Sequence, residues 1–213
     1  MLDEANVRPS TGLTALLDER EATIAASLIP AIARDGTLYP IDKMEAHRSG
    51  VLHQAVSVFV LSGAEMLIQR RAAHKYHCGR QWANTCCTHP HWGETIADAA
   101  QRRTFEELGF STPLVPARAI TYSAPVGIGL FEHERVQIFF GTADKRLLRI
   151  AKNPDEVMDT RWATRETLRA EIRAHPEDFA PWFRIYLNRW AELGLEEPVS
   201  ADHYLHERRT HGD

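Results

Sequence analysis

The chain has 213 residues, of which 44% are hydrophobic and 25% are charged. That length is enough to bury one sizeable core, and we expect one α/β domain with extensions. The formal net charge of -4 excludes the basic surplus that holds nucleic acid or an anionic membrane, so any phosphate binding must be local.

The cysteines and the lack of a long apolar run set the expected compartment. Three cysteines are an odd number, and Cys86 and Cys87 are adjacent, so we do not expect a disulfide framework. No apolar stretch is long enough to span a bilayer, and no basic leader precedes an apolar segment. We therefore expect a cytoplasmic monomer with reduced thiols and with neither a membrane nor a nucleic acid as partner.

The first elements in chain order are a helix and a hairpin. Leucine and isoleucine recur at helical spacing over residues 13–28, and Pro30 ends the segment, which predicts an amphipathic helix in an N-terminal extension, residues 1–28. Residues 51–61 predict a largely buried strand that turns at Ser62-Gly63 into a second strand at 66–70.

The rest of the chain alternates strands and helices. Residues 72–90 are rich in Trp, His and Cys without a clean period, which predicts a long functional loop with short extended pieces. A helix at 94–108 is expected to end at Gly109. The further expectations are strands at 117–123, 135–142 and 156–162, helices at 165–174 and 179–193, and a polar tail at 194–213.

The helix at 94–108 carries charges on the side that should face the core. The residues that share one direction on its helical wheel are Ile96, Ala100, Arg103 and Glu107. Arg103 and Glu107 are four residues apart, so they form either a buried structural ion pair or part of a cation site.

Two pairs of potential metal ligands stand at even spacing. If the chain is extended between His47 and His53, both imidazoles point to one side, and Glu132 and Glu134 share one face of the strand that follows. Each pair alone is more often a solvated surface pair or an exposed strand edge. Together with His89, three nitrogens and two carboxylates suit zinc or manganese, with near-octahedral coordination.

One segment resembles the Nudix box, a loop-helix-loop that binds divalent metal beside a diphosphate. Its matching residues are Glu94, Arg102, Glu106, Glu107, Gly109 and Phe110. Thr88 replaces the opening glycine, and Arg103 replaces a glutamate of the hydrolases. The exchange removes a metal ligand and adds a bidentate phosphate binder, which favours holding a diphosphate over hydrolysing it.

The stretch Trp-Ala-Asn-Thr-Cys-Cys-Thr-His-Pro at 82–90 closely resembles the active-site loop of type I isopentenyl diphosphate isomerases. The resemblance covers roughly residues 29–190. It implies a Nudix-type α/β (α+β) domain at 29–193, with a mixed β-sheet core flanked by helices and the extra N-terminal helix outside it.

The resemblance also implies a role for individual residues. The expected ligands of a first divalent metal, Mn²⁺ or Zn²⁺, are His47, His53, His89, Glu132 and Glu134. Glu107 and the Cys87 carbonyl are expected to serve a Mg²⁺ that bridges the diphosphate. The expected diphosphate ligands are Lys43, Arg71, Lys75 and Arg103, each of which taken alone is more often a solvated surface charge.

The chemistry implied by the family is the conversion of isopentenyl diphosphate to dimethylallyl diphosphate through a tertiary carbocation, for isoprenoid biosynthesis. Cys87 and Glu134 are expected on opposite faces of the substrate, with Tyr122 bonded to Glu134 and the Trp182 ring stabilising the cation. Cys86 is expected to face the other way. The alternatives are a Nudix hydrolase of a nucleoside diphosphate derivative and a binding module with structural zinc, which the adjacent cysteines do not favour.

Overall fold

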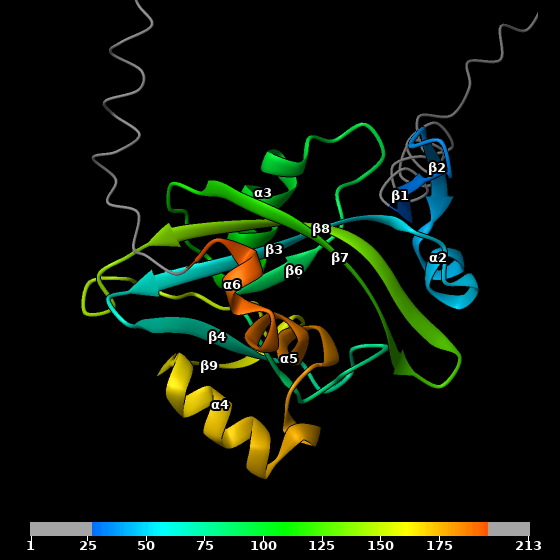
Figure 1. The fold of residues 1–213 in the computed structure, drawn as a ribbon. Helices are drawn as coiled ribbons and strands as arrows, with labels where there is room; N and C mark the ends of the chain where they lie inside the picture. The colour runs from blue at the N-terminus through cyan, green and yellow to red at the C-terminus, as the bar shows by residue number, and fades with distance from the viewer. Residues whose placement is uncertain (1–26, 196–213) are drawn as a thin grey trace, which may run out of the picture.

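The computed structural model describes residues 27–195, and nine strands of this part form one mixed sheet. β3 and β8 run parallel at its centre, whereas β4, β6 and β1 pair antiparallel with β3 (Figure 1). The strands are β1 (Leu28–Ile32), β2 (Leu38–Asp42), β3 (His53–Ser62), β4 (Glu65–Arg71), β5 (Trp82–Ala83), β6 (Cys86–Thr88), β7 (Val115–Gly127), β8 (Leu130–Thr142) and β9 (Val157–Thr164).

Helices cover the sheet on both faces. The helices are α2 (Lys43–Ser49), α3 (Ile96–Leu108), α4 (Arg165–Ala174), α5 (Pro181–Asn188) and α6 (Trp190–Leu193). Alternate residues of β3 serve different cores: Val56 and Val58 pack with the α3 side, and Phe59 packs with the α5–α6 side. The alternation of side chains along a strand therefore gives the sheet two apolar faces, each covered by helices. The expected α/β architecture, a mixed sheet flanked by helices, is confirmed (Figure 1).

Several predicted elements are confirmed, and others differ in length. The β3–β4 hairpin turns where expected, with Gly63 at a φ of 60°, and α4 has the predicted bounds. The segment 72–90 contains only the short β5 and β6, as expected. α3 begins at Ile96 rather than at residue 94, because the Thr95 hydroxyl accepts a hydrogen bond from the Asp98 N–H and caps the helix.

Three parts of the chain differ from the expected elements. β7 and β8 are each 13 residues long, because they continue as a hairpin to a turn at 128–129. The predicted helix at 179–193 is two helices, since the chain leaves helical geometry at Arg189. The segment from Leu28 to Asp42, for which no strand was expected, forms the β1–β2 ribbon.

The N-terminal prediction is the largest correction. Most of the predicted helix at 13–28 lies outside the described residues, but Leu28 and Pro30 belong to β1. Pro30 pairs with Pro40 of β2. A proline lacks the N–H that a ladder uses, and the two-stranded ribbon at the margin of the sheet tolerates the two missing donors. Within residues 27–195, no helix is both long and apolar enough to cross a membrane.

Candidate active site

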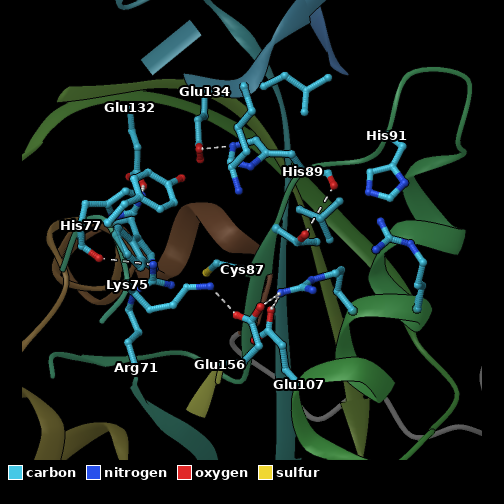
Figure 2. A pocket seen from close by; sticks show the side chains of 18 of the residues that line it. Arg71, Lys75, His77, Cys87, His89, His91, Glu107, Glu132, Glu134 and Glu156 are labelled. Atoms are coloured by element: carbon cyan, nitrogen blue, oxygen red, sulfur yellow. Dashed lines mark hydrogen bonds and ion pairs between the residues drawn. The ribbon is translucent and has the colours of Figure 1, made fainter. Parts of the chain in front are cut away.

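A pocket opens where β6, β7, β8, α3 and α5 meet the segment that follows β4 (Figure 2). Cys87 lies between Glu132 and Glu134 on one side and the Lys75–Glu156 pair on the other. The sequence-predicted residues that line the pocket are Lys43, Arg71, Lys75, Cys87, His89, Arg103, Glu107, Tyr122, Glu132, Glu134 and Trp182. His47 and His53 are fully buried behind its wall.

Strand pairing brings the carboxylates to the histidines. β3 and β8 are parallel with His53 opposite Glu134, and β7 places Tyr122 opposite Glu134. Glu132 and Glu134 are 4% and 5% exposed, so the prediction that they share one face is confirmed. They lie inside β8 rather than at its end, which explains why neither is a solvated edge residue.

His47 reaches this group from a helix, which differs from the extended chain on which the even-spacing argument depends. The chain between His47 and His53 is not extended, because His47 lies in α2, which Asp42 caps at the start and Gly50 ends in the left-handed conformation. Even spacing therefore does not explain the meeting of the two rings. Their centroids are nevertheless 5.1 Å apart, since the turn at Gly50 folds the helix back beside β3.

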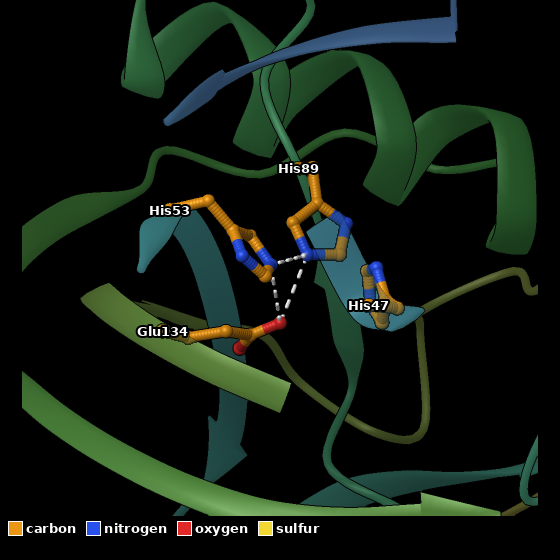
Figure 3. A group of neighbouring side chains, drawn as sticks. All are labelled: His47, His53, His89 and Glu134. Atoms are coloured by element: carbon orange, nitrogen blue, oxygen red, sulfur yellow. Dashed lines mark hydrogen bonds and ion pairs between the residues drawn. The ribbon is translucent and has the colours of Figure 1, made fainter. Parts of the chain in front are cut away.

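Ring nitrogens of the histidines and a carboxylate oxygen of Glu134 converge on one point (Figure 3). The hydrogen atoms available there are too few to make a hydrogen bond for every close pair of these atoms. His53 Nε2 lies 3.1 Å from His89 Nε2, and His89 Nε2 lies 2.8 Å from Glu134 Oε1. The Nδ1 atoms of His47 and His53 are each 2.7 Å from a backbone carbonyl, which only accepts, so each Nδ1 carries the hydrogen and each Nε2 presents a lone pair.

These lone pairs fit a shared cation. His47 Nε2 is buried and has no hydrogen-bond partner among residues 27–195. Two ligand atoms about 2.1 Å from one metal ion are about 3.0 Å apart when adjacent in an octahedron. The measured separations of 2.8 to 3.5 Å among His53, His89 and Glu134 match that spacing, so the residues present fit a divalent metal.

The predicted five-ligand set divides into two groups in the structure. His47, His53, His89 and Glu134 offer ligand atoms within 4.8 Å of one another, whereas Glu132 groups with His47 and with His77. His77 was not among the predicted ligands. Its only signal is its place in the His- and Cys-rich segment 72–90, which has no period to mark a buried face.

Burial favours the neutral form of His47, His77 and His89, which is the form that binds a metal. It lowers the pKa of His89 to about 3 and that of His77 to about 2, with Arg71 as the next cause for His77. Burial and then the charge of Glu134 raise the pKa of Glu132. Burial also opposes ionisation of Glu134, but the adjacent imidazoles of His53 and His89 hold its pKa well below the usual value.

Tyr122 links the two carboxylates. Its Oη lies 2.8 Å from Glu132 Oε2 and 2.8 Å from Glu134 Oε2. A phenol carries one hydrogen, so it donates to one carboxylate at a time. The expected hydrogen bond between Tyr122 and Glu134 is confirmed, and the phenol holds the carboxylate in place at the pocket.

The two adjacent cysteines face opposite sides of the sheet. Cys86 is fully buried in the core on the α3 side, and Cys87 packs on the other side and lines the pocket. The prediction that Cys86 faces away is confirmed. Cys87 Sγ lies 2.9 Å from Asn84 Oδ1 and 3.2 Å from Ser57 Oγ, two partners that the sequence analysis missed. Burial raises the pKa of the Cys87 thiol above its usual value.

The opposite side of the pocket is cationic, and two of its charges, Lys75 and Arg103, are paired with carboxylates. Lys75 Nζ lies 2.6 Å from Glu156 Oε2, and Arg103 Nη2 lies 2.7 Å from Glu107 Oε1 and 3.2 Å from Glu156 Oε1. Glu156, at the start of the predicted strand 156–162, was not assigned to the site. Burial and the neighbouring cations Lys75 and Arg103 lower the pKa of Lys43 to about 8.

Trp182 closes the pocket from α5. Its side chain is 2% exposed, the Arg71 guanidinium lies 5.2 Å from its ring centre, and the His77 ring meets it edge-on. The indole is therefore a fixed aromatic wall between the cationic side and the histidines. Its Nε1 is buried without a hydrogen-bond partner among the described residues.

Comparison with known proteins places this architecture in a family. The NUDIX domain family matches residues 51–183. A solved protein of Deinococcus radiodurans shares the fold with a TM-score of 0.62 at 16% identity, covering 76% of this chain and 98% of that one. A MutT protein of Methanosarcina mazei has a TM-score of 0.53 at 15% identity, covering 66% and 93%.

Curated relatives match at much higher identity. An isopentenyl-diphosphate Delta-isomerase of Cereibacter sphaeroides is 53% identical over 162 residues, which is 75% of this chain and 90% of that protein. An isopentenyl-diphosphate Delta-isomerase of Rhodobacter capsulatus is 43% identical over 179 residues, 84% of this chain and all of that protein.

Proposed function

Since the chain belongs to the NUDIX domain family and, within it, to the isopentenyl-diphosphate Delta-isomerases, we propose that this pocket performs their reaction with Cys87 and Glu134 as the opposed catalytic groups. The protein is an isomerase that converts isopentenyl diphosphate to dimethylallyl diphosphate, a step of isoprenoid biosynthesis. The proposed catalytic unit is residues 29–193, flanked by an extension at 1–28 and a tail at 194–213.

The reaction moves a double bond by adding a proton at one carbon and removing another from its neighbour. An acid and a base must therefore stand on different sides of the bound alkene. Cys87 on β6 and Glu134 on β8 line one pocket from different strands, which supports this pairing. Tyr122 holds Glu134 through its hydroxyl, and Asn84 holds the Cys87 thiol.

The cationic side is the proposed diphosphate site. The groups proposed to bind the diphosphate oxygens are Lys43, Arg71, Lys75 and Arg103. Glu107 is 4% exposed and faces the same pocket, so we propose that it holds Mg²⁺ together with the Cys87 carbonyl. Arg103 stands where a hydrolase carries a carboxylate, and it favours holding the diphosphate over cleaving it.

A second divalent metal, Mn²⁺ or Zn²⁺, is proposed at the histidines. The proposed ligands are His47, His53, His89, Glu132 and Glu134, a nitrogen-rich set that suits either ion. When bound, the ion supplies positive charge that fixes and tunes Glu134. The tautomers that the Lys43 and Val51 carbonyls impose on His47 and His53 prepare the site for it.

The intermediate carbocation has to be stabilised and kept from water. Trp182 offers the face of a fixed, buried indole on the wall of the pocket, and a cation near such a face is stabilised. The buried Glu134 and the half-buried Cys87 lie away from bulk solvent. Together they would let the cation lose a proton before water adds to it.

The observation that carries the proposal is the presence of a buried carboxylate and a thiol on one pocket that also has a cationic side. The test is incubation of the metal-loaded protein with isopentenyl diphosphate in deuterated water. We expect dimethylallyl diphosphate that carries solvent deuterium, with no phosphate released. Release of phosphate without exchange would instead identify a hydrolase.

A further inference from the structure

His77 occupies a position in the metal-binding region that the proposed five ligands do not explain. It lies after β4 in the segment 72–90, is 8% exposed, and stacks on His47 with ring centroids 5.9 Å apart. Its Nε2 is 4.0 Å from Glu132 Oε1, and the ligand atoms of His77, His47 and Glu132 lie within 4.8 Å of one another. The His77 imidazole thus faces Glu132, the proposed ligand that does not belong to the group around Glu134.

Hydrogen bonding does not account for this placement. The 4.0 Å separation from Glu132 exceeds hydrogen-bond length, and His77 Nδ1 is buried with no partner within the described part of the chain. No hydrogen bond within the described residues therefore fixes either ring nitrogen of His77, and Nε2 on the Glu132 side is left available to a metal ion. The separation lies between about 3.0 Å and about 4.2 Å, the spacings of adjacent and opposite ligands in an octahedron with bonds of about 2.1 Å.

We propose that His77 is a sixth protein ligand of the divalent metal, on the Glu132 side of the site. This inference rests on the proposed metal site of five ligands, which in an octahedron leaves one position open. His77 fills that position. The coordination sphere is then made entirely of protein side chains.

A metal without an open position has a restricted chemistry. Catalytic ions that activate water keep a position free, whereas ions with only protein ligands are structural. The ion here would fix Glu134 and its neighbours without presenting a hydroxide to the diphosphate. His77 therefore helps to make the site one that moves protons and does not hydrolyse its substrate.

The experiment counts exchangeable water on the bound ion. Full-length protein is loaded with one equivalent of Mn²⁺ without substrate, and the paramagnetic relaxation of water protons is measured together with the Mn²⁺ dissociation constant. The variants are His77→Phe, which keeps a ring against Trp182, and His77→Ala. The control is His74→Ala, since His74 is an exposed histidine of the same segment.

We expect low relaxivity for the wild type and for His74→Ala. Both His77 variants should show a higher relaxivity, because water takes the vacated position, and a Mn²⁺ affinity weaker by about 10- to 100-fold or more, the loss that even an outer partner of a ligand causes. Unchanged relaxivity and affinity in His77→Phe would overturn the proposal, and circular dichroism checks that this variant is folded.

A reference variant separates this inference from the metal site itself. His89→Ala removes a ligand of the Glu134 group and should strongly weaken Mn²⁺ binding. If His89→Ala weakens binding and the His77 variants do not, the five-ligand site stands and the sixth ligand is wrong. If His89→Ala also binds normally, the metal site was placed wrongly and His77 loses its proposed role with it.

Discussion

The two sides of the pocket are built in opposite ways. On the histidine side, lone pairs of His53, His89 and Glu134 meet at 2.8 to 3.5 Å with too few hydrogens. On the cationic side, Lys75 and Arg103 are already paired with carboxylates of the same chain. The histidine side therefore presents lone pairs that a bound cation would satisfy. On the cationic side, a phosphate could replace a carboxylate as the partner of Lys75 or Arg103.

Burial explains why the two sides behave differently. The histidine side is closed, with His47 and His53 at 0% exposure, so unsatisfied groups there are costly and call for a resident ion. The Lys75–Glu156 pair is about one-fifth exposed on each side chain, and such partly solvated pairs contribute little net stability. A diphosphate can replace Glu156 as the partner of Lys75 at small cost.

The largest expected effect comes from removing the proposed acid and base. Glu134→Gln and Cys87→Ser should each lower kcat by about 10²- to 10⁴-fold, the range for losing a positioned acid or base. Steady-state conversion of isopentenyl diphosphate measures this. Cys86→Ser is the matched control, because Cys86 points into the other core, and it should stay near wild-type activity. If Cys86→Ser were the inactive variant, the choice between the thiols would be wrong.

Removing metal should damage the histidine side specifically. A ligand at about 100 times its dissociation constant stabilises the folded state by about 2.7 kcal/mol. For a chain of this size, chelation should therefore lower Tm by about 5–10 °C. Differential scanning calorimetry with and without chelator measures the change. His89→Ala should start at the lower Tm and no longer respond to chelator; an equal response in both proteins would contradict the site.

The side-chain period predicts the orientation of site residues that lie in regular helices and strands. The shared face of Glu132 and Glu134, the opposite faces of Cys86 and Cys87 and the burial of Glu107 all follow from strand or helix periodicity, and the structure confirms them. These residues lie in regular elements. Their neighbours along the element are enough to tell which way they point.

Periodicity failed where the chain is irregular or where the partner is distant. His77 and Glu156 lie at loop positions, and only the fold reveals that one meets Glu132 and the other meets Lys75. His47 reaches the site from the short helix α2, whereas its even spacing from His53 places the two rings on one side only if the chain is extended. Nothing in the sequence around Ser57 distinguishes it from other strand residues. Its contact with Cys87 depends on the pairing of β6 with β3, which places the two residues opposite each other.

Reversing one charge should damage the cationic side while leaving the histidine side alone. Arg103→Glu loses a charge-assisted bond worth about 1.5–3 kcal/mol, so the Michaelis constant should rise by about 10- to 100-fold. Substrate titration of the steady-state rate measures this, and Tm with and without chelator should keep the wild-type difference. Arg146→Glu makes the same charge change at a site that is 82% exposed, and should alter neither quantity. An unchanged Michaelis constant in Arg103→Glu would remove its assigned role.

The smallest expected effect lies between the two sides, at the thiol. Ser57 Oγ lies 3.2 Å from Cys87 Sγ and donates to Tyr186 Oη at 2.8 Å, so it connects the thiol to the core under α5. Ser57→Ala loses both contacts, and the one that bears on catalysis is the neutral contact with the thiol. That contact is worth about 0.5–1.5 kcal/mol, so its loss should lower kcat by about 2- to 10-fold. The Michaelis constant should not change, because Ser57 contacts neither the diphosphate site nor the histidines.

Ser62→Ala is the matched control for that variant. Ser62 ends the same strand, and within residues 27–195 its hydroxyl accepts only from the exposed Lys145 N–H. Ser62→Ala should leave kcat unchanged. A rise in the Michaelis constant of Ser57→Ala would show that the thiol and the diphosphate site are coupled. The thiol would then belong to the cationic side. That result would contradict the division of the pocket into a histidine side and a cationic side with Cys87 between them.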